Sequence, residues 1–134
     1  MTEHTEQALL IMWAKRNESR WPELKWLSSS LNGIYIPGPR AIVNRIVNYM
    51  KSEGGFKKGI PDLSLPVARH GYHGLFIEMK RNDGGVVSKE QEEFMAFAAE
   101  NNYLDKVCFG FDDARDTLEW YLEGRRTVIR KEHK

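Results

Sequence analysis

Three ionisable side chains near the middle of the chain, Asp62, Glu78 and Lys80, have types and spacing suited to metal-dependent hydrolysis. Carboxylate oxygens are the ligands that hard cations such as Mg²⁺ and Mn²⁺ prefer. A bound divalent ion polarises a phosphate and activates water, while a nearby lysine orients that water and stabilises the charge that develops. If the two carboxylates share one ion, this set has the equipment to hydrolyse a phosphodiester bond.

The segment that carries these residues, 59–80, reads as two strands joined by a turn. Apolar residues alternate or run together over 62–67 and 74–80, and Arg69-His70-Gly71 interrupts them. Because side chains alternate between the two faces of a strand, the apolar residues fall on one face: Leu63, Leu65 and Val67 on the first strand, and Leu75, Ile77 and Met79 on the second. If that face is buried, the three ionisable side chains all project from the opposite face.

The position of the turn sets how the two strands align. A hairpin centred on His70 or Gly71 places Asp62 directly opposite Glu78 or Lys80. Directly opposed β-carbons lie roughly 4.5–5.5 Å apart, which is close enough for two carboxylates to hold one cation. The alternative is an ordinary salt-bridge cluster on the solvent-exposed face of an amphipathic hairpin.

The same stretches resemble a known family. GIPDL at 59–63, GLFIEMKR at 74–81 and SKEQ at 88–91 are similar to the motifs of the VRR-NUC branch of the PD-(D/E)XK nucleases, particularly its small stand-alone phage-type members. The similarity runs from the first helix to about Leu122. It implies a restriction-endonuclease-like fold, in which helices flank a mixed sheet, and the activity of a metal-dependent DNA endonuclease.

The resemblance also implies further ligands at the metal. The Met79 carbonyl would join Asp62 and Glu78 around one or two Mg²⁺ or Mn²⁺ ions. These nucleases carry an additional acidic residue on a helix close to the metal, and we expect Glu6 in that role, with Glu3 as the alternative.

Substrate and assembly follow from the resemblance as well. Stand-alone members are similar to Holliday junction resolvases, which act as homodimers on four-way DNA in DNA repair. We therefore expect branched DNA as the substrate and a homodimer formed through apolar residues of the helices or the segment 34–36. The alternatives are a less selective nicking or flap endonuclease, and a DNA-binding module without catalytic activity.

Hydrophobic periodicity and turn signals predict the element order α-β-α-β-β-α-β-α. Around the hairpin, we expect a helix over 3–16, a strand over 24–29, a helix over 40–53, a helix over 88–100, a strand over 106–111 parallel to the Glu78 strand, and a last helix after Asp112-Asp113. The second helix has a predicted core stripe: Ile42, Val43, Ile46, Val47 and Met50. In the last helix, Leu118, Tyr121 and Leu122 are predicted to pack inward.

Three candidate residues also have an ordinary structural explanation. Glu6 lies early in its helix, where a negative charge is favourable. Gln91 completes an S-x-x-Q capping box with Ser88, yet it also lies on the inward side of its helix near the end of the Glu-Met-Lys strand. Asn32-Gly33 is a tight turn in any protein, and it also matches an element that VRR-NUC members have near their site.

Basic residues concentrate around the candidate site. The net charge is only +1, but residues 34–81 hold eight Lys and Arg against three Asp and Glu, whereas 82–123 hold three against eleven. Such a distribution favours contact with nucleic acid. The residues expected at DNA phosphates are Lys57, Lys58, Arg40, Asn32, Arg69 and Arg81. The two loop lysines are the best placed, and a solvated helix face would explain Arg40 equally well.

Length and composition set the remaining expectations. The 134 residues predict one nuclease domain over 1–124 and a basic tail over 125–134 without regular structure, which either touches DNA phosphates or solubilises the terminus. The single cysteine, Cys108, predicts a buried thiol and a reducing compartment. No apolar run approaches the roughly 20 residues of a membrane span. The first residues lack the basic start and apolar core of a signal peptide, so we expect none. We expect a cytoplasmic protein of a bacterial or phage-infected cell.

Overall fold

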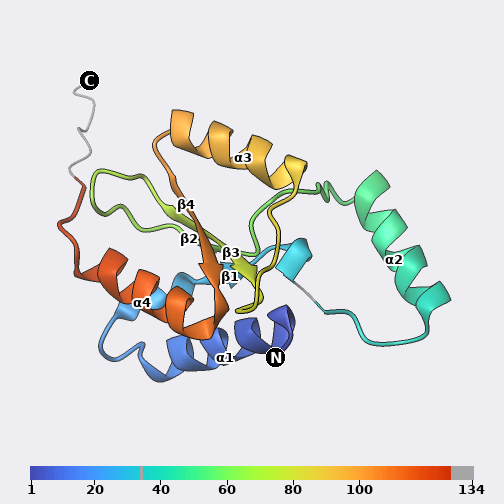
Figure 1. The fold of residues 1–134 in the computed structure, drawn as a ribbon, viewed down its shortest axis with the longest axis horizontal. Coiled ribbons are helices and arrows are strands. Elements are labelled where there is room, and N and C mark those ends of the chain that lie inside the picture. Colours follow the sequence, from blue (N-terminus) through green and yellow to red (C-terminus); the bar gives the residue numbers. More distant parts are fainter. Residues whose placement is uncertain (34, 128–134) are drawn as a thin grey trace.

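A computed structural model describes residues 1–33 and 35–127 and contains the predicted order of elements (Figure 1). The first half comprises helix α1 (Glu3–Arg16), the 3₁₀ turn η1 (Pro22–Trp26), strand β1 (Ser28–Ser29), the 3₁₀ turn η2 (Leu31–Gly33) and helix α2 (Arg40–Ser52). The second half comprises β2 (Leu63–Leu65), β3 (Leu75–Lys80), α3 (Lys89–Glu100), β4 (Leu104–Phe109) and α4 (Gly110–Glu123).

The four strands form one mixed sheet in the order β1-β2-β3-β4. The pairs β1–β2 and β2–β3 are antiparallel, and β3–β4 is parallel, as the crossover through α3 requires. Helix α3 lies on one side of the sheet, and α1 and α4 lie on the other (Figure 1). A mixed sheet flanked by helices is therefore confirmed.

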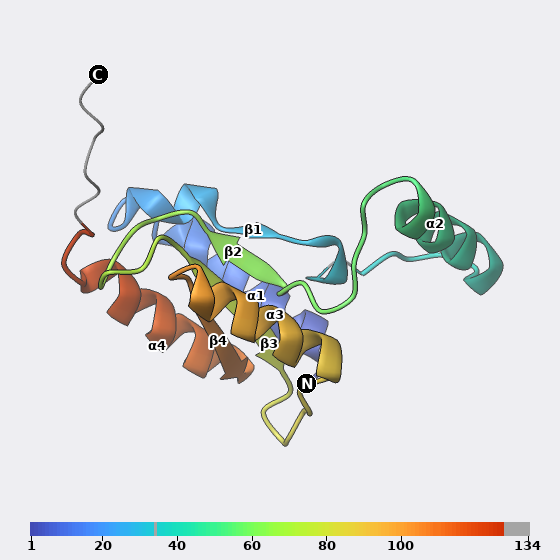
Figure 2. The ribbon, with the colours of Figure 1, turned by 90° about the horizontal axis from the view of Figure 1, so that it is seen from above.

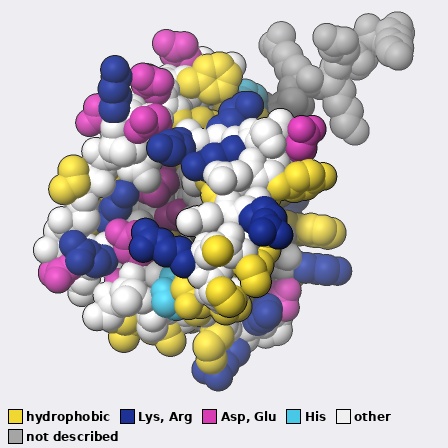
Figure 3. Space-filling model, turned by 90° about the vertical axis from the view of Figure 1, so that its right-hand side faces the viewer, with side chains coloured by type: hydrophobic (Ala, Val, Ile, Leu, Met, Phe, Trp, Pro, Cys, Tyr) yellow, Lys and Arg dark blue, Asp and Glu magenta, His cyan; other side chains and the backbone are white. Residues whose placement is uncertain are grey.

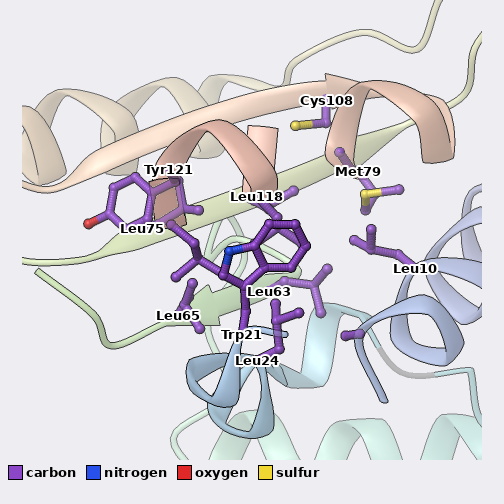
Figure 4. Packing of buried hydrophobic residues seen from close by; sticks show 14 residues of the cluster. Leu10, Trp21, Leu24, Leu63, Leu65, Leu75, Met79, Cys108, Leu118 and Tyr121 are labelled. Carbon is purple, nitrogen blue, oxygen red and sulfur yellow. The ribbon is translucent and has the colours of Figure 1, made fainter. Parts of the chain in front are cut away.

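The core lies on the side of the sheet that α1 and α4 cover (Figure 4). Five of the six residues predicted to face inward are buried, namely Leu63, Leu65, Leu75, Ile77 and Met79, whereas Val67 lies beyond the end of β2 and is only half-buried. They pack against Leu10 of α1, Trp21 and Leu24 at η1, and Leu118 and Tyr121 of α4. The alternation predicted for the hairpin is thus confirmed, and its polar face is directed toward α3. Cys108 is buried in the same cluster, as predicted.

The hairpin turn and one extra residue on its first strand together set the alignment of β2 and β3. Arg69 pairs with Tyr72 at the turn, whereas Leu65 pairs with Leu75, so residues 66–68 stand opposite only 73–74. His70 and Gly71 both have positive φ, 54° and 83°, and Tyr72 N donates to the Arg69 carbonyl at 2.8 Å, which is the pattern of a tight two-residue turn. Leu63 pairs with Ile77. Extending that register by one residue places Asp62 opposite Glu78, the first of the two predicted alignments.

Four element boundaries differ from the prediction. Strand β2 is Leu63–Leu65, shorter than the expected 62–67, because Pro66 has no backbone donor to continue the ladder. The first half of the expected strand over 24–29 belongs to the 3₁₀ turn η1, because Pro22 lacks a backbone donor and favours a helical start. Strand β4 begins and ends two residues earlier than expected. Helix α4 begins at Gly110, ahead of Asp112-Asp113, where a φ of 87° turns the chain and Asp113 Oδ2 accepts a hydrogen bond from Phe109 N at 2.9 Å.

Helix α2 does not contribute to the core, so that prediction was wrong. No residue of α2 is buried, and Ile42 and Ile46 of its predicted core stripe are 51% and 36% exposed. Figures 1 and 2 show α2 projecting from one end of the molecule on two connecting segments. Amphipathic periodicity indicates that one face of a helix is to be covered, but it does not say that the same chain covers it. We call Ile42, Val43, Ile46, Val47 and Met50 the α2 stripe.

The first residues of the predicted tail contact the hairpin turn without forming a helix or strand. His70 N donates to the Arg125 carbonyl, and Gly71 N donates to Thr127 Oγ1, each at 3.0 Å. Thr127 Oγ1 in turn donates to the Tyr72 carbonyl at 3.0 Å. The rest of that prediction concerns residues 128–134, which lie outside the described part of the chain. Among the described residues, no helix has the length and apolar character needed to cross a membrane.

Candidate active site

The three predicted ionisable residues meet on the polar face of the hairpin, and all three are buried. Asp62 is 8% exposed, Glu78 5% and Lys80 7%. A solvated salt-bridge cluster is therefore excluded as the explanation for them. Buried charges require partners, because their transfer from water is costly. The identity of those partners decides what the site can do.

Asp62 lies just before β2 and is held through both its backbone and its side chain. Its carbonyl accepts a hydrogen bond from Ser30 N at 2.8 Å. Its Oδ2 accepts a second bond from Met79 N at 2.7 Å. The N–H and C=O of one residue in a strand point toward the same neighbour, so the Met79 carbonyl is also directed to the side of Asp62.

Glu78 contacts three of the predicted site residues. Its Oε1 accepts a hydrogen bond from Gln91 Nε2 at 2.6 Å and lies 3.9 Å from Lys80 Nζ. The Asp62 carboxylate stands opposite Glu78 in the extended strand register and is close enough to raise the pKa of Glu78. The predicted convergence of two carboxyl groups and one ammonium group is present.

The electrostatics of the pair favour a bound cation. Burial, and after it the adjacent Asp62 carboxylate, together raise the pKa of Glu78 to about 8, with Lys80 opposing the shift. Burial also raises the pKa of Asp62, against the hydrogen bond from Met79. Two buried carboxylates this close repel each other, and a single lysine does not neutralise both. The oxygen donors and the excess negative charge fit Mg²⁺ or Mn²⁺.

An open cavity of about 390 Å³ gives access to this pair. The residues that line it come from the starts of α1 and α3, from η2, from the segment 58–62 and from β3: Glu3, Asn32, Lys58, Gly59, Ile60, Asp62, Glu78, Lys80, Ser88, Glu90 and Gln91. Figure 3 shows acidic side chains recessed in a hollow that Lys and Arg side chains surround. A negatively charged centre with basic surroundings suits a phosphate that approaches a metal ion.

Of the two acidic residues considered on α1, Glu3 lines the cavity and Glu6 does not. Glu6 is buried, and its Oε2 faces Gly110 so closely that a Cβ there would come within 2.9 Å of it. Its carboxylate therefore lies at the N-terminus of α4, where a negative charge is favourable. Within residues 1–33 and 35–127, no three His, Cys, Asp or Glu side chains form a group that could hold a metal ion. A metal here relies on Asp62, Glu78 and other oxygen donors.

Gln91 performs both of the roles considered for it. Its Oε1 accepts from Ser88 N at 2.8 Å and its backbone N donates to Ser88 Oγ at 3.2 Å, which completes the capping box. Its Nε2 donates to Glu78. The two ends of one amide thus connect the start of α3 to the acidic pair.

A Gln91→Glu substitution separates these two roles. Glutamate at this position keeps a capping box but places a carboxylate against Glu78 in place of a donor. We expect cleavage to fall by about 10- to 100-fold, as for other groups that orient metal ligands, with little change in helix content by circular dichroism. A Gln91→Ala variant loses both roles and should also melt at a lower temperature. Unchanged cleavage by Gln91→Glu would limit Gln91 to capping.

Asn32 supports the loop that leads into Asp62. Its Nδ2 donates to the carbonyls of Lys57 and Ile60 at 3.0 and 3.1 Å. On the other side of this loop Gly59, with a φ of 88°, lies so close to α3 that a Cβ would come within 2.5 Å of the Glu90 carbonyl oxygen. Asn32 lines the cavity, but its donors are used to hold the loop.

Four of the predicted phosphate-binding residues lie at the cavity or on the surface of the molecule. Lys58 lines the cavity and Lys57 precedes it in the same loop. Arg81 directly follows the site lysine, and its exposed side chain lies 3.7 Å from Asp83. Arg40 is exposed at the start of α2. These four positions can meet solvent or a nucleic acid.

Arg69 does not belong with them, so its prediction was wrong. It is 8% exposed, its Nη2 lies 3.7 Å from Glu23 Oε1, and its Nη1 donates to the Ala68 carbonyl at 2.9 Å. It lies at the hairpin turn, at the opposite end of the strands from Asp62. Its guanidinium group is paired within the protein and is not available to DNA. A count of basic residues along the sequence does not separate such a buried arginine from an exposed one.

Two acidic residues near the site were missed. Glu90 lines the cavity from the first turn of α3, and its position beside Gln91 in the SKEQ stretch was the available signal. Asp105 of β4 pairs with Phe76, so it shares the sheet face of Glu78. Both of its carboxylate oxygens are buried without a hydrogen-bond partner, and burial raises its pKa to about 6. The parallel register that brings it there was not predictable.

The stability of the protein should depend on pH because Asp62 and Glu78 are buried next to each other. The folded-state pKa of Glu78 is raised from 4.5 to about 8, so its contribution to stability is fully present below pH 4.5 and is lost as pH rises toward 8. Without metal, the wild type should therefore lose stability relative to a Glu78→Gln variant across this window, by a few kcal/mol at about 1.4 kcal/mol per pKa unit. Mg²⁺ or Mn²⁺ should raise the melting temperature more at pH 8 than at pH 6.

Thermal melts of both proteins at several pH values, with metal and with EDTA, measure these effects. A constant difference between wild type and variant from pH 5 to pH 8 would contradict the assigned pKa shift.

The fold and the acid–lysine set together define a nuclease-type protein. A family model described as the VRR-NUC domain matches residues 1–112. A solved structure described as a VRR_NUC domain protein is similar, with a TM-score of 0.72 and 26% identity, over 96% of this chain and 93% of that one. No curated protein matches the chain. The chain belongs to the VRR-NUC family, and a nuclease-type, hydrolytic function follows from that membership.

Proposed function

We propose that the protein is a Mg²⁺- or Mn²⁺-dependent DNA endonuclease. The observation that carries this proposal is the pair of buried carboxyl groups, Asp62 and Glu78, held against Lys80 at the base of an open cavity. The Met79 carbonyl is directed to the same place and is the proposed third donor. Glu3, which lines the cavity, replaces Glu6 as the proposed acidic residue from α1.

The residues around the acidic pair each have a definite task in this proposal. When bound, the metal supplies a Lewis acid for the phosphate and a water of lowered pKa. Lys80 orients the attacking water and stabilises negative charge on the phosphate. Gln91 fixes the position of Glu78 through its 2.6 Å hydrogen bond. Lys58, at the edge of the cavity, contacts the DNA backbone beside the scissile bond.

Branched DNA, in particular a four-way junction, is the proposed substrate, and DNA repair is the proposed context. Symmetrical cleavage of a junction needs two active sites in one assembly, and this chain supplies one. The described part of the chain covers the α2 stripe only partly: Ile42 and Ile46 are exposed, and Val43, Val47 and Met50 are half-buried. A second copy that packs against the stripe would form a homodimer. The loop that follows α2 leads to Asp62, so the interface and the active site are connected through a short segment.

A divalent-metal titration with several DNA substrates tests the function. The proposal predicts cleavage of a four-way junction in Mg²⁺ or Mn²⁺, no cleavage in EDTA, and slower cleavage of a flap and a linear duplex. Equal rates on all three substrates would favour a less selective endonuclease. Metal-independent binding without cleavage would instead favour a DNA-binding module. Light scattering that found a persistent monomer would count against junction resolution but would still allow simple nicking.

A further inference from the structure

A second cleft lies beside the catalytic cavity and takes no part in the proposed chemistry. Its volume is about 270 Å³, and its lining residues come from α1 and the segment before α2: His4, Gln7, Ala8, Ile11 and Tyr35. The rings of Tyr35 and His4 are stacked, with centroids 4.8 Å apart and planes inclined by 12°. Tyr35 is nevertheless 66% exposed. A large part of this aromatic surface is therefore open to a ligand.

The cleft and the catalytic cavity share the N-terminal end of α1. Glu3 lines the cavity, and His4, the next residue, lines the cleft. Asn32 lines the cavity as well, and Tyr35 follows it by three positions in the chain. A DNA strand with one phosphate in the cavity would therefore carry a neighbouring nucleotide past the cleft.

The chemistry of the cleft fits a base better than a phosphate. Within residues 1–33 and 35–127, neither lysine nor arginine lines it, and its walls are an aromatic pair, an alanine and an isoleucine with a single glutamine. Aromatic side chains bind exposed bases by stacking, whereas a base inside a duplex is already stacked and paired. We propose that this cleft binds an unpaired nucleobase next to the scissile phosphate, with Tyr35 as the stacking surface. This inference rests on the proposed nuclease function and gives it a physical basis for preferring branched DNA.

The test measures binding without cleavage. A fluorescent flap DNA is compared with the same DNA in which the first two unpaired nucleotides at the branch are abasic, by anisotropy in EDTA. Stacking of one base corresponds to an affinity difference of about 5- to 150-fold. We expect wild type and Tyr35→Phe to show such a preference for the DNA with bases, and Tyr35→Ala to lose it. Trp26→Ala is the matched control, because Trp26 is a similarly exposed aromatic residue, at 61%, outside the cleft.

Each other outcome overturns the inference. Equal affinity of the wild type for both DNAs, or an unchanged preference in Tyr35→Ala, removes the base-binding role while leaving the nuclease proposal intact. Equal weakening on both DNAs, together with loss of a dimer by Tyr35→Ala in light scattering, assigns Tyr35 to an interface between copies. Absence of any DNA binding by the wild type would count against the proposed function itself.

Discussion

A Glu78→Gln variant is expected to lose cleavage and gain stability at the same time. Loss of a metal-binding carboxylate should reduce the cleavage rate in Mg²⁺ at least about 100-fold, because metal ions contribute several kcal/mol to such reactions and each 1.36 kcal/mol is tenfold. The metal-free variant should unfold at a higher temperature near pH 8, since the amide removes one of two adjacent buried carboxylates. Single-turnover cleavage and thermal melts in EDTA measure both effects.

Lys80→Met should have the opposite effect on stability. It should also abolish cleavage, but it should lower the melting temperature near pH 8, because it removes the ammonium group 3.9 Å from Glu78 Oε1. Lys106→Met is the matched control, since Lys106 is exposed on the next strand and does not line the cavity. Wild-type cleavage by either Glu78→Gln or Lys80→Met would remove that residue from the mechanism.

An Ile46→Asp variant in the α2 stripe is expected to be a monomer that cuts a four-way junction on one strand only. A charge placed in an apolar interface must be desolvated without a partner. We expect the dissociation constant of the dimer to rise at least about 100-fold, which is the effect of losing a central interface residue. Light scattering across a concentration series measures assembly, and the ratio of paired to single cuts in a junction-bearing plasmid measures the consequence.

Asn48→Asp is the control for this variant. It adds the same charge to α2 at an exposed position outside the stripe, so it should leave both assembly and paired cutting unchanged. If Ile46→Asp remained a dimer with paired cuts, the interface would have to lie elsewhere on the molecule.

The centre of the site was predictable from the sequence because strand periodicity is local. Leu63, Ile77 and the other alternating apolar residues determine which side of the hairpin is buried. The turn at His70-Gly71 then determines to within one residue which residues stand opposite each other. Continued unchanged, it would place Asp62 opposite Met79, and the extra residue between Leu65 and Arg69 shifts the register so that Asp62 stands opposite Glu78.

The errors concern features that depend on how whole elements pack. The start of α1 carries two plausible acidic residues, and only the packing of the helix against α4 shows that Glu3, and not Glu6, lines the cavity. The α2 stripe has the pattern of a core helix, but the connecting segments carry it away from the sheet. Arg69 carries a positive charge that could bind DNA, but its side chain is buried in an ion pair with Glu23. Periodicity and charge do not encode these long-range relations.

Binding of Mn²⁺ to the protein without DNA, followed by electron paramagnetic resonance, tests the central claim most directly. The claim is that Asp62 and Glu78 jointly hold a divalent cation. It predicts saturable binding by the wild type at pH 8 that is strongly weakened in both Asp62→Asn and Glu78→Gln and retained in Lys106→Met. Binding of equal strength in all four proteins would show that the metal, if it acts at all, is held by other residues, and would contradict the account.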